Sequence, residues 1–469
     1  MSETFDWQEK IYPKKVKGKF RTIKWVLTSV FLAIYFMLPW IKIDGRQAVL
    51  FDVPDRKFYI FNIVFWPQDL FYLAILMLFL AMALFFFTAV AGRLWCGYAC
   101  PQTVFTDLFI AIERCIEGDR HERMALDHAP WTMKKIFEKI IKHSVWLALS
   151  FAVSFTFVAY FVPPQELGWR IANGNLTAAH AFWLFLFIAT IYSFCGFFKE
   201  LICLVPCPYG RFQSALCDQD TLIIGYDVKR GEPRGHVKKG EGTTGAHGDC
   251  VDCSLCVHVC PTGIDIRNGL QYECIGCADC IDACNSVMKR VGKQEGLIRY
   301  GSLNIFNGGS THVLRPRVVL YAFILVVLMA GLLYKVTMRT PLEIDVIRNR
   351  HALYQKTADG KILNIYTIKA LNMDNKDHSF MVKVDGIPAK LMIGNNPIQV
   401  KKGEVYQTTV SLAIDEKATT KKVSHFAFII EDVDNPKIKA RRESTFLAPV
   451  MGFKEEVIWK QKNRSGPRQ

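Results

Sequence analysis

Five long apolar runs constrain this chain more than any other feature of its sequence. A helix that spans a bilayer needs about 20 mostly apolar residues. The runs hold 17 to 22 residues each, contain no Asp, Glu, Lys or Arg, and have His180 as their only histidine. Buried helices of a large soluble protein are the alternative, but these lengths match a bilayer better. We therefore predict five transmembrane helices, over residues 25–41, 70–91, 144–162, 178–198 and 318–334.

The basic residues orient these helices. The chain has a net charge of +15, and its Lys and Arg residues alternate between the connecting segments. Residues 1–24, 92–143 and 199–317 carry seven, eight and fourteen of them, against three in 44–69 and one in 163–177. Because basic loops stay on the cytoplasmic side, we expect the amino end and the 199–317 loop inside and residues 337–469 outside. The charge thus reflects topology and anionic lipid, and no nucleic-acid motif accompanies it.

Eight of the 15 cysteines form two runs with the spacing C-x2-C-x2-C-x3-C, which is the pattern of bacterial two-cluster ferredoxins. In that pattern the fourth cysteine of each run ligates the other cluster. We therefore assign one [4Fe–4S] cluster to Cys250, Cys253, Cys256 and Cys284, and the second to Cys274, Cys277, Cys280 and Cys260. Zinc competes for C-x2-C pairs, but two identical quartets favour iron–sulfur clusters. All 15 cysteines fall on the predicted inner side or at its membrane boundary, as expected for metal-binding thiols in a reducing compartment.

Two C-x3-C-P motifs follow the second and fourth apolar runs. Cys96 and Cys100 precede Pro101, and an offset of 107 residues superposes them on Cys203 and Cys207, which precede Pro208. On a continuous helix the two cysteines of a pair would share one face and could hold a soft metal such as Cu(I). Each proline would end that helix or start the next.

The structural alternative is that these cysteines are small buried side chains. The spacing also leaves open whether the two pairs hold one metal or two. Nearby basic residues would help to stabilise thiolates: Arg93, Lys199 and Arg211. Three single thiols have no assigned role: Cys195 is expected to fill the core, Cys115 to lie on an amphipathic helix over 104–116 at the membrane surface, and Cys217 is left open.

After the last apolar run the pattern changes to short alternating segments, at 362–371, 380–384, 405–414 and 423–430. Turn residues separate them, which predicts about seven strands in an immunoglobulin-like sandwich without disulfides. No catalytic group stands out, so a docking module is expected. The predicted organisation is a cytoplasmic segment 1–24, a four-helix membrane region 25–217, a ferredoxin-like domain 218–317, a fifth transmembrane helix 318–336, a periplasmic β-sandwich 337–455 and a polar tail 456–469.

This combination resembles the cytochrome c oxidase accessory proteins, the CcoG, FixG or RdxA family. The segments that carry the resemblance are 95–105, 203–213 and 250–284. It implies a multi-pass protein of the bacterial inner membrane that is needed to assemble a cbb-type haem–copper oxidase. It further implies reduction of Cu(II) to Cu(I), with the copper site carried onto Cys96, Cys100, Cys203 and Cys207. A wider group of membrane ferredoxins in nitrate and nitrous-oxide respiration shares the cysteine plan.

The leading hypothesis is therefore a membrane cupric reductase. A donor on the inner side would reduce two [4Fe–4S] clusters, and Cu(I) would pass to a copper chaperone or transporter or to oxidase subunits. No dinucleotide-binding glycine pattern is present, so a direct nicotinamide site is not expected. Two alternatives stay open: an electron conduit from quinol or a soluble donor to another membrane complex, and an assembly scaffold whose clusters are structural.

Overall fold

The chain divides into two compact units, residues 1–332 and 333–469. The computed structural model describes residues 10–43, 45–61, 63–235, 248–339, 341–349, 353–357, 359–374, 376–415 and 422–449. The predicted tail at 456–469 lies outside the described residues.

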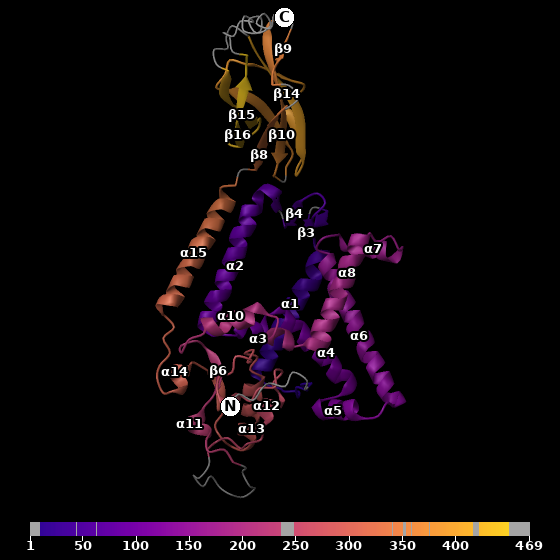
Figure 1. Cartoon of the computed structure of the whole chain (residues 1–469), viewed down its shortest axis with the longest axis vertical. Coiled ribbons are helices and arrows are strands. Elements are labelled where there is room, and N and C mark those ends of the chain that lie inside the picture. Colours follow the sequence, from indigo (N-terminus) through magenta and orange to yellow (C-terminus); the bar gives the residue numbers. More distant parts are fainter. Residues whose placement is uncertain are drawn as a thin grey trace, which may run out of the picture. The chain divides into compact units, whose positions relative to one another are not determined.

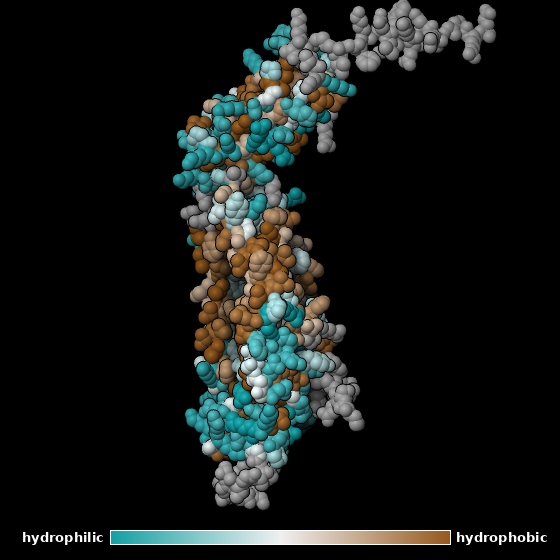
Figure 2. Space-filling view, turned by 90° about the vertical axis from the view of Figure 1, so that its left-hand side faces the viewer, coloured by the Kyte–Doolittle hydropathy of each residue, from teal (hydrophilic) through white to brown (hydrophobic). Residues whose placement is uncertain are grey.

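Five helices in the described ranges are long and apolar enough to cross a membrane, as predicted. In Figure 2 their hydrophobic side chains form a belt that ends at the hydrophilic ferredoxin region. One of the five, α8, continues directly into a π-helical segment, η3. The helices are α1 (Lys19–Met37, extended by η1, Leu38–Trp40), α2 (Leu70–Ala91), α6 (Met133–Val158), α8 (Ala178–Ile191) with η3 (Tyr192–Phe198), and α15 (Pro316–Thr337).

Two of these helices begin at least one full turn earlier than predicted. Helix α1 starts at Lys19 and α6 at Met133, in both cases before the uncharged run. The extra turns are helical because protein carboxylates neutralise their buried cations. Lys24 lies 2.8 Å from Asp107, and Lys142 lies 2.9 Å from Glu117. A search for uncharged residues alone misses such turns, since a buried charge is tolerated only when it is paired.

Shorter elements connect the spans. Helix α4 packs against α6 and η3, and its buried face includes Phe109, which joins Trp146 and Cys195 in one cluster. Cys195 is thus a core residue, as predicted, and protein packing explains the amphipathic pattern that we attributed to the membrane surface. The elements are β1 (Lys42–Ile43), β2 (Arg46–Gln47), β3 (Val49–Asp52), β4 (Lys57–Ile60), β5 (Ile63–Phe65), η2 (Pro67–Asp69), α3 (Leu94–Tyr98), α4 (Pro101–Glu117), α5 (Arg120–His128), α7 (Pro164–Ala172), α9 (Leu201–Leu204) and α10 (Pro208–Leu216).

The ferredoxin region lies at one end of the membrane helices (Figure 1). Two antiparallel strands, β6 and β7, pair the segments before and after the cysteine quartets. Its core gathers Ile224, Ile281, Met288 and Ile298 beside cysteines of both quartets. The elements are β6 (Ile223–Tyr226), α11 (Val228–Gly231), α12 (Leu255–His258), η4 (Ile266–Asn268), α13 (Asp279–Arg290), β7 (Ile298–Gly301) and α14 (Leu303–Phe306).

Helix α1 joins this region to the membrane helices. The Asp282 carboxylate on α13 accepts hydrogen bonds from the backbone N–H groups of Phe20 and Arg21, at 3.3 and 2.7 Å. The buried Arg21 guanidinium lies between Asp107 of α4 and Asp279 of α13, at 3.2 and 3.3 Å. A side chain of the ferredoxin thus caps a membrane helix, which satisfies donors that would otherwise be orphaned.

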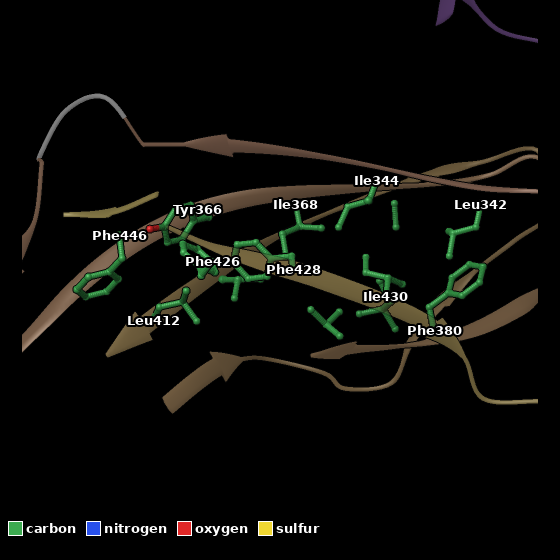
Figure 3. Packing of buried hydrophobic residues seen from close by; sticks show 14 of the residues in the cluster. Leu342, Ile344, Tyr366, Ile368, Phe380, Leu412, Phe426, Phe428, Ile430 and Phe446 are labelled. Carbon is green, nitrogen blue, oxygen red and sulfur yellow. The ribbon is translucent and has the colours of Figure 1, made fainter. Parts of the chain in front are cut away.

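The second unit is a β-sandwich, which confirms the predicted fold. One sheet has the order β12-β14-β10-β8 with β9 added beside β10, and the other has the order β13-β11-β15-β16. Aliphatic and aromatic side chains fill the space between the sheets (Figure 3), with Tyr366 against Phe426 and Phe428. The strands are β8 (Leu342–Arg348), β9 (Gln355–Lys356), β10 (Lys361–Asn372), β11 (His378–Asp385), β12 (Lys390–Ile393), β13 (Ile398–Val400), β14 (Val405–Asp415), β15 (Val423–Asp432) and β16 (Lys439–Leu447).

Candidate metal centres

The ferredoxin cysteines line two cavities. The first is lined by Cys250, Cys253, Cys256 and Cys284, and the second by Cys260, Cys274, Cys277 and Cys280, with Cys256 in the lining of both. Apart from this shared cysteine, the sets match the crossed assignment that we took from the ferredoxin pattern. Apolar side chains complete both walls, among them Val287 and Ile298 in the first cavity and Ile264 and Ile275 in the second. Four thiols in an apolar enclosure fit a [4Fe–4S] cluster, which would supply one-electron transfer when bound.

The two quartets also share a backbone conformation. The residues on either side of Cys253 and of Cys277 all have positive φ, between 50° and 71°. They are Asp252, Ser254, Gly276 and Ala278, and three of them are not glycine. Non-glycine residues with positive φ are strained, so the fold must impose this conformation at both sites. The two cysteine quartets therefore repeat both their spacing and the backbone conformation around their second cysteines.

Within the described residues, no three His, Cys, Asp or Glu side chains converge tightly enough to hold a single metal ion.

The two C-x3-C-P motifs have matching local structures. Cys96 lies in the short helix α3, whereas Cys100 is extended and directly precedes α4, which starts at Pro101. Cys203 lies in α9, and the extended Cys207 precedes α10, which starts at Pro208. The cysteines of each pair therefore do not lie on one continuous helix, which was the condition for a shared face. Each proline starts a new helix, one of the two outcomes that we considered, because it needs no N–H partner there.

The two motif segments pack against each other. Arg93 donates a hydrogen bond to the carbonyl of Gly210, and the Gln213 side-chain amide donates to the carbonyl of Gly92, both at 2.7 Å. The Gln213 carbonyl oxygen in turn lies 3.8 Å from the Cys96 sulfur. Sequence reasoning missed Gln213 and Gly210, since nothing in a single sequence distinguishes them from other residues of α10.

Electrostatic interactions link all four thiols. Cys96 interacts with Cys100 and Cys207, and Cys203 interacts with each of the other three. Burial raises the pKa of Cys96 to about 12, a rise that Arg93 partly opposes. Burial likewise raises the pKa of Cys203 to about 12, and the neighbouring thiols add to the rise. Both thiols are therefore protonated at neutral pH, so metal binding must displace protons.

The basic residues near the motifs have different roles. Arg93 acts on Cys96 as predicted, but Lys199 forms a 2.8 Å ion pair with Glu113 instead of serving a thiol. The Arg211 side chain lies outside what the structure describes. The Cys115 thiol is exposed, and Cys217 lines a cavity beside Cys274 and Tyr300.

The first motif contacts the loop of the second cluster. A Cβ atom placed on Gly97 would lie 2.7 Å from the carbonyl oxygen of Gly276, so the two backbones are in direct contact. The Tyr300 hydroxyl donates to the same carbonyl at 3.0 Å, and the Tyr98 hydroxyl lies 3.3 Å from that of Tyr300. The cysteines of this motif and the ligands of the second cluster are thus carried by adjoining segments.

Comparison with known proteins agrees with this architecture. Residues 198–303 match a 4Fe–4S dicluster domain, residues 73–114 a 4Fe–4S binding domain, and residues 332–449 the immunoglobulin-like fold at the C-terminus of FixG. The chain is 38% identical over 426 residues to the nitrogen fixation protein FixG of Rhizobium meliloti. This match covers 83% of this chain and 81% of FixG. It belongs to the FixG/RdxA family.

Other members of the FixG/RdxA family are similar to the same extent. RdxA of Cereibacter sphaeroides is 41% identical over 394 residues, which cover 80% of this chain and 82% of RdxA. A crystal structure of a FixG-related protein from Vibrio parahaemolyticus matches 24% of this chain and 98% of that one, at 26% identity and a TM-score of 0.21. The chain is thus a membrane-associated iron–sulfur protein of the FixG/RdxA family, suited to electron transfer.

Proposed function

We propose that this protein reduces Cu(II) to Cu(I) at the thiols of Cys96, Cys100, Cys203 and Cys207, for assembly of a cbb-type cytochrome c oxidase. Copper is the substrate of this reaction. Each Cu(II) ion takes one electron, and the thiols of one pair release their protons as Cu(I) binds. Two thiolates favour the reduced ion, so binding and reduction support each other.

The contact between Gly97 and Gly276 carries the proposal. It puts the segment with Cys96 and Cys100 against the segment with Cys277, in a direct backbone contact. Cys100 and Cys207 each directly precede a helix, where the helix dipole favours negative charge such as a thiolate. These are features of a site that receives electrons and holds a soft cation.

The proposed topology follows from the basic loops. With the amino end and the ferredoxin region in the cytoplasm of a bacterium, all 15 cysteines would face or border the reducing compartment. The β-sandwich would then lie in the periplasm, where oxidase subunits or a copper chaperone or transporter could dock.

Copper titration of the purified full-length protein tests the proposal. Protein reduced with dithionite and freed of excess reductant is mixed anaerobically with Cu(II), and Cu(I) is trapped with a coloured chelator. Replacing Cys96 and Cys100 with Ser should abolish Cu(I) retention and lower the reduction rate at least tenfold, while cluster absorbance stays. Cys115→Ser, which alters an exposed thiol outside the motifs, is the matched control.

Unchanged Cu(II) reduction in the double variant would refute the copper site and favour an electron conduit to another membrane complex. Oxidase assembly that survives the loss of cluster ligands in cells would favour the scaffold alternative. Neither result would disturb the family assignment.

A further inference from the structure

A cavity of about 390 Å³ lies between α4, α6, η3 and the ligand loop of the second cluster. Its wall includes Glu113, Lys142, His143 and Trp146 on the side of the membrane helices. Pro261 and Thr262 close the opposite side, and they directly follow Cys260. The Thr262 hydroxyl lies 3.3 Å from the Cys260 sulfur. A ligand in this cavity would therefore be close to a residue assigned to the second cluster.

The lysines around the cavity have carboxylate partners. Lys199 pairs with Glu113 at 2.8 Å, and Lys142 pairs with Glu117 at 2.9 Å. Lys139 and Lys10 both lie 2.6 Å from Asp127. Lysines that already have carboxylate partners leave little free positive charge for a phosphate or an acidic lipid headgroup. The cavity suits an uncharged ligand with a few polar groups.

Aromatic rings and one imidazole form the membrane side of this cavity. The His143 ring stacks on Phe197, with centroids 6.0 Å apart and an interplanar angle of 17°. Its Nδ1 lies 2.9 Å from the Tyr192 hydroxyl, which orients the imidazole. The Trp146 ring meets His143 edge-on at 5.3 Å. Flat apolar walls with one oriented imidazole suit a planar ring that carries hydroxyl or carbonyl groups.

An open groove adjoins the cavity along α6. His143 and Lys139 line both spaces, and Ile140 and Leu147 continue the groove along one face of that helix. Ile140 is 58% exposed and Leu147 is 52% exposed, on a helix that is apolar and long enough to span a membrane. An isoprenoid chain could lie in this groove while its headgroup occupies the cavity.

From these features we propose that the cavity binds the headgroup of a membrane quinol, which serves as the electron donor. Oxidation of one quinol to a quinone releases two electrons and two protons. The two clusters take one electron each. The Nε2 atom of His143 accepts the first proton from a quinol hydroxyl while Nδ1–H donates to Tyr192, and both protons leave through the imidazole to water. The proposal depends on the clusters but not on copper.

Binding of quinones to the full-length protein in nanodiscs tests this assignment. The probes are decylubiquinone, which carries a tail, and a photoreactive azidoquinone whose attachment sites are mapped by mass spectrometry. We expect labels within 131–147 and 192–204, and competition by decylubiquinone. His143→Leu should weaken binding at least tenfold and Tyr192→Phe severalfold, with cluster absorbance intact. The matched control is His180→Leu. The His180 imidazole is hydrogen-bonded to the Thr177 hydroxyl at the N-terminal end of α8, whereas Tyr192 follows the C-terminal end.

Labels confined to other segments, or equal affinity in His143→Leu and the unaltered protein, would overturn the proposal. Competition by flavin mononucleotide but not by decylubiquinone would also overturn it, in favour of a soluble flavin donor. Because these measurements use no copper, they can refute the quinol site without refuting the proposed cupric reductase activity. In the same way, a Cys96→Ser variant should bind the quinone as the unaltered protein does.

Discussion

Gly97 of the first C-x3-C-P motif lies in direct backbone contact with Gly276 of the second-cluster loop, where a Cβ on Gly97 would come within 2.7 Å of the Gly276 carbonyl oxygen. That atom belongs to the backbone and cannot rotate away, so a methyl group here must push the two segments apart. Because electron transfer weakens steeply with separation, pushing these segments apart should slow the proposed route.

Gly97→Ala should slow Cu(II) reduction by the dithionite-reduced protein at least tenfold while both clusters remain. The rate of Cu(I) trapping and the cluster absorbance measure the two effects. Gly168→Ala is the control, because Gly168 also lies in a helix and a methyl group added there would meet nothing within 4 Å. An unaltered rate in Gly97→Ala would show that electrons reach copper by another path.

Asp282→Ala should weaken the attachment of the ferredoxin region to the first turn of α1. The substitution removes the acceptor for the backbone N–H groups of Phe20 and Arg21. Losing a charged hydrogen-bond partner costs about 2 kcal/mol. We expect cluster absorbance to bleach at a lower temperature and proteases to cut near residue 18 more readily. Glu295→Ala, an exposed acidic residue after α13, should leave both readouts unchanged.

Cys284→Ala should remove the first cluster and spare the second. Cys284 lines only the first cavity, whereas the second retains Cys260, Cys274, Cys277 and Cys280. Iron content should fall by about half, and the magnetic interaction between two reduced clusters should vanish from the electron paramagnetic resonance spectrum. Cys115→Ala should keep its full iron content. A Cys284→Ala protein without any iron would contradict independent assembly of the two sites.

The β-sandwich should be more stable in mild acid than in mild base. Burial by itself lowers the pKa of His378, but hydrogen bonds to Asp374 and Asp432, with the charges of both, outweigh burial and raise that pKa above its ordinary 6.5. Only the protonated ring can donate to both carboxylates, at 3.0 and 2.9 Å. A raised pKa in the folded state means stability that is complete below the unfolded pKa and lost as pH rises through the folded one.

Hydrogen exchange of the β11 and β15 amides in the full-length protein measures this effect. Protection should decrease between pH 6 and pH 8 after correction for intrinsic exchange, and His378→Gln should remove most of the difference. His425→Gln replaces an exposed histidine of the same domain and serves as the control. Equal pH dependence in His378→Gln and the unaltered protein would contradict the assigned role.

Local patterns in the sequence predict much of this architecture. Apolar runs indicate five helices because lipid requires uninterrupted apolar length. The quartet spacing indicates two clusters because tight loops carry three thiolates around one cube. Alternation after residue 340 indicates strands that bury one face. Each of these signals depends on residues that are near in the chain, which is why one sequence suffices to find them.

The helix ends and the thiol sites needed the tertiary structure. The charged turns of α1 and α6 are helical only because Asp107 and Glu117, from α4, neutralise Lys24 and Lys142. Likewise, only the fold brings Gln213 to Cys96 and Gly97 to Gly276, residues more than 100 positions apart. Sequence alone indicated the iron–sulfur clusters and the five apolar helices of the described residues, since both follow from local chemistry. Tertiary structure decided which segments meet, because pairing of buried charges and close backbone contacts depend on distant partners.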